Sequence, residues 1–292
     1  MKQAKKSLTE GNILKALVAL SLPIIGANLL QTGYQLVDAF WVGRLGANAV
    51  AAVSVSYPVN FLLISLTSGF AFAGTILVAQ YAGAKNLKMV NHVATQTIVM
   101  VFLMSLVLSS IAYALSPQIL TWLGVGPEIF AEADLFQRVI FIGLVFNFSF
   151  ILFQSLLRGI GEVRIPLYIN SVSLGLNFLL DPLFIYGWGP IPAFGVAGAA
   201  YSTLATIGLS AIIGHYILFY GKTEFNLVLK GFRFDFQMLK RAFKLGMPSS
   251  LEISARAFGL TLLTGVAAKF GTEVLAAYGV GARLISFVVI VA

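Results

Sequence analysis

Apolar runs long enough to cross a lipid bilayer are the feature of this chain that most limits its fold. A membrane-spanning helix needs about 20 mainly apolar residues, and 59% of the 292 residues are hydrophobic while only 10% are charged. Because the bilayer core offers no partners for free backbone groups, such runs must form helices. We therefore predict an all-α polytopic membrane protein. The expected spans cover residues 14–42, 51–80, 91–115, 133–157, 165–187, 195–220 and 239–267, with an eighth that begins near 275 and is cut short at Ala292.

The basic residues predict which way these spans cross the membrane. With the N-terminus in the cytoplasm, the inside segments hold fourteen Lys and Arg, and the outside segments hold only Arg44, Arg138 and Lys269. Positive residues favour the cytoplasmic side, so we expect a multi-pass protein of the inner or plasma membrane with a cytoplasmic N-terminus. The net charge of +8 reflects these connecting segments rather than a nucleic-acid surface.

Enzyme chemistry and metal chemistry are not expected. The chain has no cysteine, which excludes thiolate nucleophiles and thiolate metal sites. Its two histidines, His92 and His215, lack metal-ligand spacing, and no phosphate-binding loop is present. We expect no cofactor, and small organic compounds and the lipid bilayer as the partners.

A weak internal repeat predicts two related lobes. A shift of 225 residues pairs Pro23 with Pro248 and Gly46 with Gly271 among six identities in thirty-nine positions. An even number of spans separates the copies, so the repeat would be parallel and a complete protein would have about twelve spans. We expect residues 1–220 to form a first six-helix lobe, 221–238 a cytoplasmic amphipathic linker, and 239–292 the start of the second lobe, with helices 8–12 incomplete or missing. The linker is predicted equally well as an interfacial helix or as a basic loop.

Polar residues inside the spans predict a cation site. On the span 165–187, Asn170, Asn177 and Asp181 share one helical face, and Asp38 lies on the polar face of the first span. Counting from the ends of the two apolar runs, Asp38 and Asp181 should lie at nearly the same depth. Two level carboxylates in lipid need a shared proton or cation. The alternatives are local hydrogen bonds, which we consider most seriously for Asn177 and Thr203.

Further polar residues predict a substrate cavity. Glu252 and Arg256 are spaced for an ion pair, and the sequence equally allows Glu252 to bind a cationic substrate. Pro23 and Pro182 are the expected hinges, since Pro182 removes the helical donor of the Phe178 carbonyl. The cavity candidates are Gln31, Tyr34, Gln35, Asn147, Gln154, Glu252 and Arg256.

Several stretches together resemble the multidrug and toxic compound extrusion (MATE) transporters, in particular the prokaryotic DinF-like and NorM-like branches. They include "LSLPIIGANLLQTGYQLVDAFWVGRLGANAVAA" at 20–52, "LVAQYAGAKN" at 77–86, "LLRGIGEVRIPLYIN" at 156–170 and "LNFLLDPLFIYGWGPIPAFGVAGAAYST" at 176–203. The resemblance implies twelve helices in two lobes and antiport of H⁺ or Na⁺ against large organic, often cationic, compounds. It also implies that Asp38, Asn177, Asp181 and Thr203 bind the coupling cation.

We also consider two alternative functions. A lipid-linked oligosaccharide flippase of related architecture would have a more basic central cavity. A non-transporting membrane receptor or scaffold would give no reason for two level carboxylates.

Overall fold

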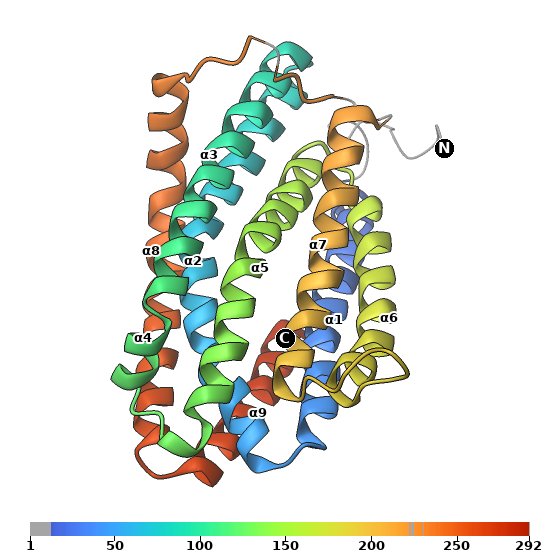
Figure 1. The fold of residues 1–292 in the computed structure, drawn as a ribbon. Coiled ribbons are helices and arrows are strands. Elements are labelled where there is room, and N and C mark those ends of the chain that lie inside the picture. The colour runs from blue at the N-terminus through green and yellow to red at the C-terminus, as the bar shows by residue number, and fades with distance from the viewer. Residues whose placement is uncertain (1–12, 222, 224, 230, 292) are drawn as a thin grey trace.

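The computed structural model describes residues 13–291 apart from 222, 224 and 230. The described residues fold into nine helices, and the longest connection joins α7 to α8 (Figure 1). This result confirms the predicted all-α class. The helices are α1 (Ile13–Gly43), α2 (Ala47–Gly83), α3 (Leu87–Ala114), α4 (Ser116–Trp122), α5 (Pro127–Gly159), α6 (Arg164–Tyr186), α7 (Val196–Tyr220), α8 (Phe236–Ala268) and α9 (Thr272–Val291).

The long apolar runs coincide with the long helices, as predicted. By length and composition, six of the described helices can cross a membrane: α2, α3, α5, α6, α7 and α8. Two details differ from the prediction. The seven-residue helix α4 was not expected, and α5 begins six residues before the predicted start of its span, at Pro127. Both helices carry proline in the first turn, where the missing N–H has no helical partner to lose.

The connection between α7 and α8 is an ordered segment rather than a helix. Residues 225–229 and 232–235 have no helical structure, so the interfacial-helix alternative for the linker is wrong. Phe225 and Leu227 turn inward and are 2% and 5% exposed, which removes the apolar face that such a helix needs for the membrane surface. We call the end of the bundle that carries this segment the linker side.

Helix α3 holds the end of this segment through polar side chains. The Gln96 amide donates to the Arg233 carbonyl at 2.5 Å and accepts from the Asp235 N–H at 3.2 Å. His92 Nε2 lies 2.9 Å from Asp235 Oδ2. Asp235 also caps α8 by accepting from the Met238 N–H, and this bond, followed by the contact with His92, lowers the pKa of the Asp235 carboxyl.

The predicted repeat appears in the local geometry. Shifted by 225 residues, the end of α1 and the start of α2 fall on the end of α8 and the start of α9. Gly46 and Gly271, which the shift pairs, have φ values of +108° and +103°, and each precedes a helix. Pro23 and Pro248 both lie inside their helices. Both copies run away from the linker side (Figure 1), as a parallel repeat requires.

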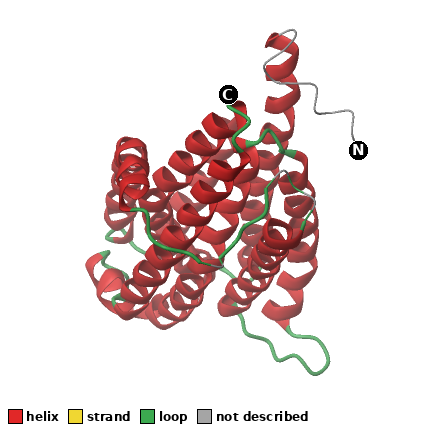
Figure 2. Cartoon of the chain, turned by 90° about the horizontal axis from the view of Figure 1, so that it is seen from above, coloured by secondary structure: helices red, strands yellow, loops and turns green. Residues whose placement is uncertain are grey.

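Glycines set the closest helix crossings. A Cβ atom on Gly69 of α2 would lie 2.1 Å from the Gly246 carbonyl oxygen of α8. A Cβ atom on Gly198 of α7 would lie 2.4 Å from the Phe184 carbonyl oxygen of α6. Such contacts are typical of membrane helices, whose association depends on close van der Waals packing. Seen from above, helices make up the body of the bundle and loops cross over the end that faces the viewer (Figure 2).

Candidate cation site and central cavity

A buried group of polar side chains joins α6 to α7. Asn177 and Asp181 are fully buried and lie one helical turn apart on α6. The Asn177 amide nitrogen donates to Asp181 Oδ1 and to the Ser202 hydroxyl of α7, both at 3.0 Å. The polar face predicted for this span therefore points into the protein, where its groups bind one another.

Helix α1 adds Asp38 to this group. The Thr203 hydroxyl of α7 donates to Asp38 Oδ2 at 3.4 Å, and the carboxyl groups of Asp38 and Asp181 lie close enough to interact directly. The structure therefore brings together the four residues predicted for the cation site, from three helices. We call Asp38, Asn177, Asp181, Ser202 and Thr203 the acidic cluster.

The acidic cluster has more acceptor atoms than donors. Asn177 Oδ1 and Asp181 Oδ2 are buried and accept no hydrogen bond from any described amide or hydroxyl group. Two neighbouring carboxylates in a buried setting repel when both are ionised and lose their hydration, so the arrangement favours a proton or a bound cation. Its ligands would be oxygen atoms, which suit hard cations. The described residues contain no cluster of three or more His, Cys, Asp or Glu side chains for a transition metal.

The hydroxyl groups of α7 divide between two roles. Thr206 and Ser210 donate to carbonyl groups of their own helix, at 2.8 Å each, as is usual for such residues in membrane helices. Thr203 instead reaches Asp38. The Tyr34 hydroxyl of α1 bonds to Thr206 and thereby ties α1 to α7 next to the acidic cluster.

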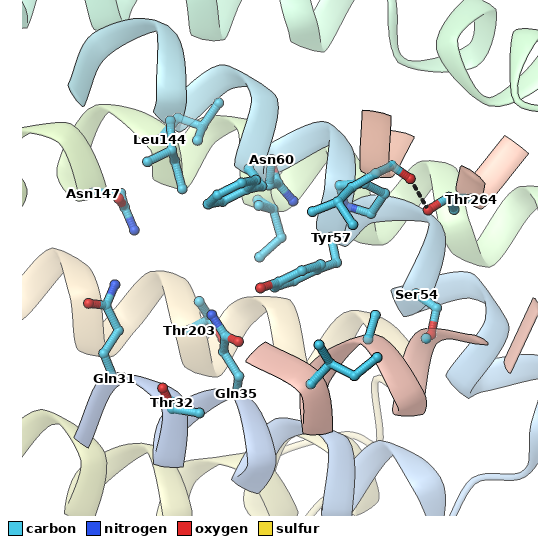
Figure 3. A pocket seen from close by; sticks show the side chains of 18 of the residues that line it. Gln31, Thr32, Gln35, Ser54, Tyr57, Asn60, Leu144, Asn147, Thr203 and Thr264 are labelled. Atoms are coloured by element: carbon cyan, nitrogen blue, oxygen red, sulfur yellow. Dashed lines mark hydrogen bonds between the residues drawn. The ribbon is translucent and has the colours of Figure 1, made fainter. Parts of the chain in front are cut away.

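A cavity of about 880 Å³ lies beside the acidic cluster, between α1, α2, α5, α7, α8 and α9. Its size is typical of small-molecule sites. Figure 3 shows Gln31, Gln35 and Thr203 on one wall with Tyr57, Asn60 and Asn147 facing them. The remaining polar lining residues are Asn28, Thr32, Ser54, Arg256, Thr264 and Tyr278, and the apolar part of the wall includes Phe61, Ile64, Ile140, Leu144, Leu204, Ile207, Leu260 and Leu263.

Four of the seven predicted cavity residues line this cavity: Gln31, Gln35, Asn147 and Arg256. The other three predictions need correction.

Tyr34 points toward α7 rather than into the cavity. Gln154 lies two turns beyond Asn147 on α5 and lines a small separate pocket with Arg158 and Glu162. Glu252, one turn before Arg256, is exposed, does not line the cavity, and forms no ion pair with Arg256.

The two expected hinges lie inside continuous helices. Helix α1 continues through Pro23, and α6 continues through Pro182 for another turn. Pro182 follows Asp181 directly, so the missing helical donor for the Phe178 carbonyl lies within a turn of the acidic cluster. The hinge role of both prolines stays a prediction.

Several residues of the cavity and the acidic cluster were missed from the sequence. Ser54, Tyr57 and Asn60 of α2 line the cavity, and their spacing of three residues is itself a signal of one helical face. Ser202, the partner of Asn177, was passed over in favour of its neighbour Thr203. Tyr278 of α9 gave no separate signal, because single tyrosines in apolar runs are common.

Comparison with known proteins decides the family. The MatE family profile matches residues 23–183, more than half of the chain, including α1 with Asp38 and α6 with Asn177 and Asp181. The chain belongs to the MatE family. The resemblance to MATE transporters found in the sequence is thereby confirmed.

Relatives and solved structures agree with this membership. The probable multidrug resistance protein YoeA of Bacillus subtilis is 32% identical over 91% of this chain and 58% of its own length. A crystal structure of MATE in complex with MaD3S superposes with a TM-score of 0.83 at 28% identity, over 96% of this chain and 63% of the other.

A MOP superfamily transporter from Pyrococcus furiosus, described as having a binding pocket of reverse polarity, gives a TM-score of 0.80 at 29% identity. That match covers 88% of this chain and 56% of the other. The chain thus spans about three fifths of the length of the proteins it matches.

Proposed function

We propose that the transporter to which this chain contributes exports organic compounds in exchange for H⁺ or Na⁺. The observation that carries the proposal is the position of the acidic cluster directly beside the cavity, with α1 and Thr203 belonging to both. The name of the Bacillus relative, a probable multidrug resistance protein, supports export of several compounds.

The coupling cation acts on the acidic cluster in this proposal. A proton or Na⁺ neutralises the Asp38 and Asp181 pair, with Asn177 and Thr203 as further oxygen ligands. Removal of that cation restores repulsion between the two carboxylates, which weakens the packing of α1 against α6 and α7. Oxygen ligands of this kind accept either cation, so the residues leave the coupling ion as H⁺ or Na⁺.

Helix α1 transmits this change to the cavity. Asn28, Gln31 and Gln35 line the cavity from the same face of the helix that carries Asp38, one to three turns away. A shift of α1, with Pro23 as the flexing point, therefore alters the cavity wall when the cation binds. Exchange requires that cation and substrate prefer different conformations, which such a shared helix provides.

The transporter works across the cell membrane with a cytoplasmic N-terminus in this proposal. The linker side carries most of the described basic residues of the connections, among them Lys85, Lys88, Arg164 and Arg233. The opposite side carries Arg44 and Lys269. The positive-inside rule then places the linker side in the cytoplasm.

Efflux measurements on the full-length transporter in proteoliposomes test the proposal. We expect a gradient of H⁺ or Na⁺ to drive dye export, and Asp38→Asn and Asp181→Asn to abolish the coupling. Glu128→Gln is the matched control, since Glu128 is an exposed acid in the first turn of α5. Export at the wild-type rate by both cluster variants would refute the proposal.

A further inference from the structure

Among the residues that the structure describes, the cavity wall carries positive charge and no negative charge. Arg256 is the one charged residue in the described lining, and no Asp or Glu is part of it. Asp38 and Asp181 lie in the acidic cluster, and Glu252 is not part of the cavity lining. A compound in this cavity therefore meets a positive group on the described wall and no negative one.

Arg256 is not neutralised by a neighbour. Its side chain is exposed, and it forms no ion pair with any described carboxylate. A guanidinium group keeps its charge at every physiological pH and offers five N–H donors in a planar fork. Such a fork matches the two oxygen atoms of a carboxylate, a sulfonate or a phosphate.

The other polar lining groups do not select the sign of a ligand's charge. The amides of Gln31, Gln35 and Asn147 and the hydroxyl groups of Tyr57 and Thr203 each donate and accept hydrogen bonds. They bind polar atoms of either kind, and Figure 3 shows them around the open centre of the cavity. The charge preference of the described wall is therefore set by Arg256.

The rest of the wall suits a hydrocarbon or aromatic body. Tyr57 and Phe61 on α2 have parallel rings with centroids 6.5 Å apart, and apolar side chains from α5, α7 and α8 complete the lining.

We propose that Arg256 makes this cavity selective for amphipathic organic anions, with an aromatic or hydrocarbon body and a carboxylate, sulfonate or phosphate group. The inference rests on the proposed function, whose cavity it specifies. It departs from the cationic substrates expected from the sequence. The anionic group would bind the guanidinium fork of Arg256, while the body lies against Tyr57, Phe61 and the aliphatic wall.

Equilibrium dye binding to the purified full-length transporter tests this proposal without any ion gradient. Carboxyfluorescein and rhodamine 6G have related ring systems and opposite charge, and fluorescence anisotropy gives the Kd of each. We expect the wild type to bind the anionic dye more tightly, and Arg256→Gln to weaken that binding about 10- to 100-fold while changing rhodamine binding little. Arg256→Glu should reverse the preference.

Lys269→Gln is the matched control, because Lys269 is an exposed cation at the end of the same helix and outside the cavity. It should leave both dissociation constants unchanged. Tighter binding of rhodamine by the wild type would overturn the proposal, as would equal loss of carboxyfluorescein binding in Lys269→Gln. Absence of gradient-driven export with the anionic preference intact would instead refute the proposed function and leave the polarity of the cavity established.

Discussion

The crossing of α2 and α8 gives a sharp test of the fold, because it depends on two glycines. In Gly246→Ala, the new Cβ atom would lie 2.4 Å from the Gly69 carbonyl oxygen and 2.7 Å from the Gly69 carbonyl carbon. Ordinary contacts of a Cβ atom begin at 3.4 Å. Both atoms belong to the backbone, so no side chain can rotate away, and the helices must separate by about 1 Å at this point.

The expected cost follows from the contacts that surround the crossing. Overpacking of a close interface costs about 1–3 kcal/mol, and a gap of about 0.5–1 Å removes a quarter to a half of each van der Waals contact beside it. Two hydrogen bonds next to the crossing would also lengthen, from Ser250 to the Leu66 carbonyl at 3.2 Å and between Ser65 and Ser254 at 2.9 Å. We therefore expect the free energy of unfolding to fall by about 2–4 kcal/mol.

Denaturant unfolding of the protein in mixed micelles, followed by circular dichroism, measures this change. Gly259→Ala is the matched control on the same helix, because no neighbour lies within 4 Å of its added Cβ atom. The control should be neutral or more stable by up to about 1 kcal/mol, from the higher helix propensity of alanine. If Gly246→Ala and Gly259→Ala unfold alike, the α2–α8 crossing described here is wrong.

Three further predictions concern the linker and the repeat. The pKa of Asp235 is lowered in the folded protein, so its ionised carboxylate stabilises the fold at pH values above about 3.9, the ordinary pKa of an aspartate. This stabilisation is lost as the pH falls through the lowered pKa. The Tm difference between wild type and Asp235→Asn should therefore be largest at neutral pH and disappear in acid. A Tm difference that does not change with pH would contradict this prediction. Gln96→Ala should lower the free energy of unfolding by about 1–3 kcal/mol, because the Arg233 carbonyl and the Asp235 N–H both lose their hydrogen-bond partner. Hydrogen exchange at residues 233–235 should become faster, and unchanged protection there would contradict this prediction. Gly46→Ala and Gly271→Ala should each cost about 1–3 kcal/mol in thermal unfolding, because alanine rarely adopts their positive φ, and clearly unequal losses would count against equivalent geometry in the two copies.

The sequence predicted the helices and the acidic cluster because both follow from local rules. An apolar run of sufficient length has to be helical in lipid, so the spans were found within a few residues of their ends. The acidic cluster followed from residue spacing and depth, since groups three or four residues apart share a face. Asp38, Asn177, Asp181 and Thr203 therefore met as expected.

The cavity was less predictable because its walls depend on how each helix is rotated against its neighbours. The spacing of Glu252 and Arg256 favours an ion pair on an isolated helix. In the folded chain the crossing at Gly69 and Gly246 fixes the position of α8, and Arg256 lines the cavity while Glu252 does not. The rotation of a helix about its axis is set by contacts with residues far away in the sequence. The residue pattern within one helix carries no information about those contacts.

Helix α4 was missed, and the linker was left between a helix and a loop, for a related reason. Basic and apolar residues at helical spacing suggested an interfacial helix, but Phe225 and Leu227 are buried against the bundle instead. Helix α4 is too short to show a periodic pattern, and only Pro117 in its first turn marks its start.

The central claim, that Asp38 and Asp181 bind the coupling cation, is tested most directly by infrared difference spectroscopy of the carboxyl groups in the full-length transporter. The spectrum is recorded while either the pH or the Na⁺ concentration is changed. We predict a carboxyl band that changes on cation binding in the wild type and is lost in both Asp38→Asn and Asp181→Asn, but is kept in Glu128→Gln. The same band, unchanged in the two cluster variants, would contradict the claim.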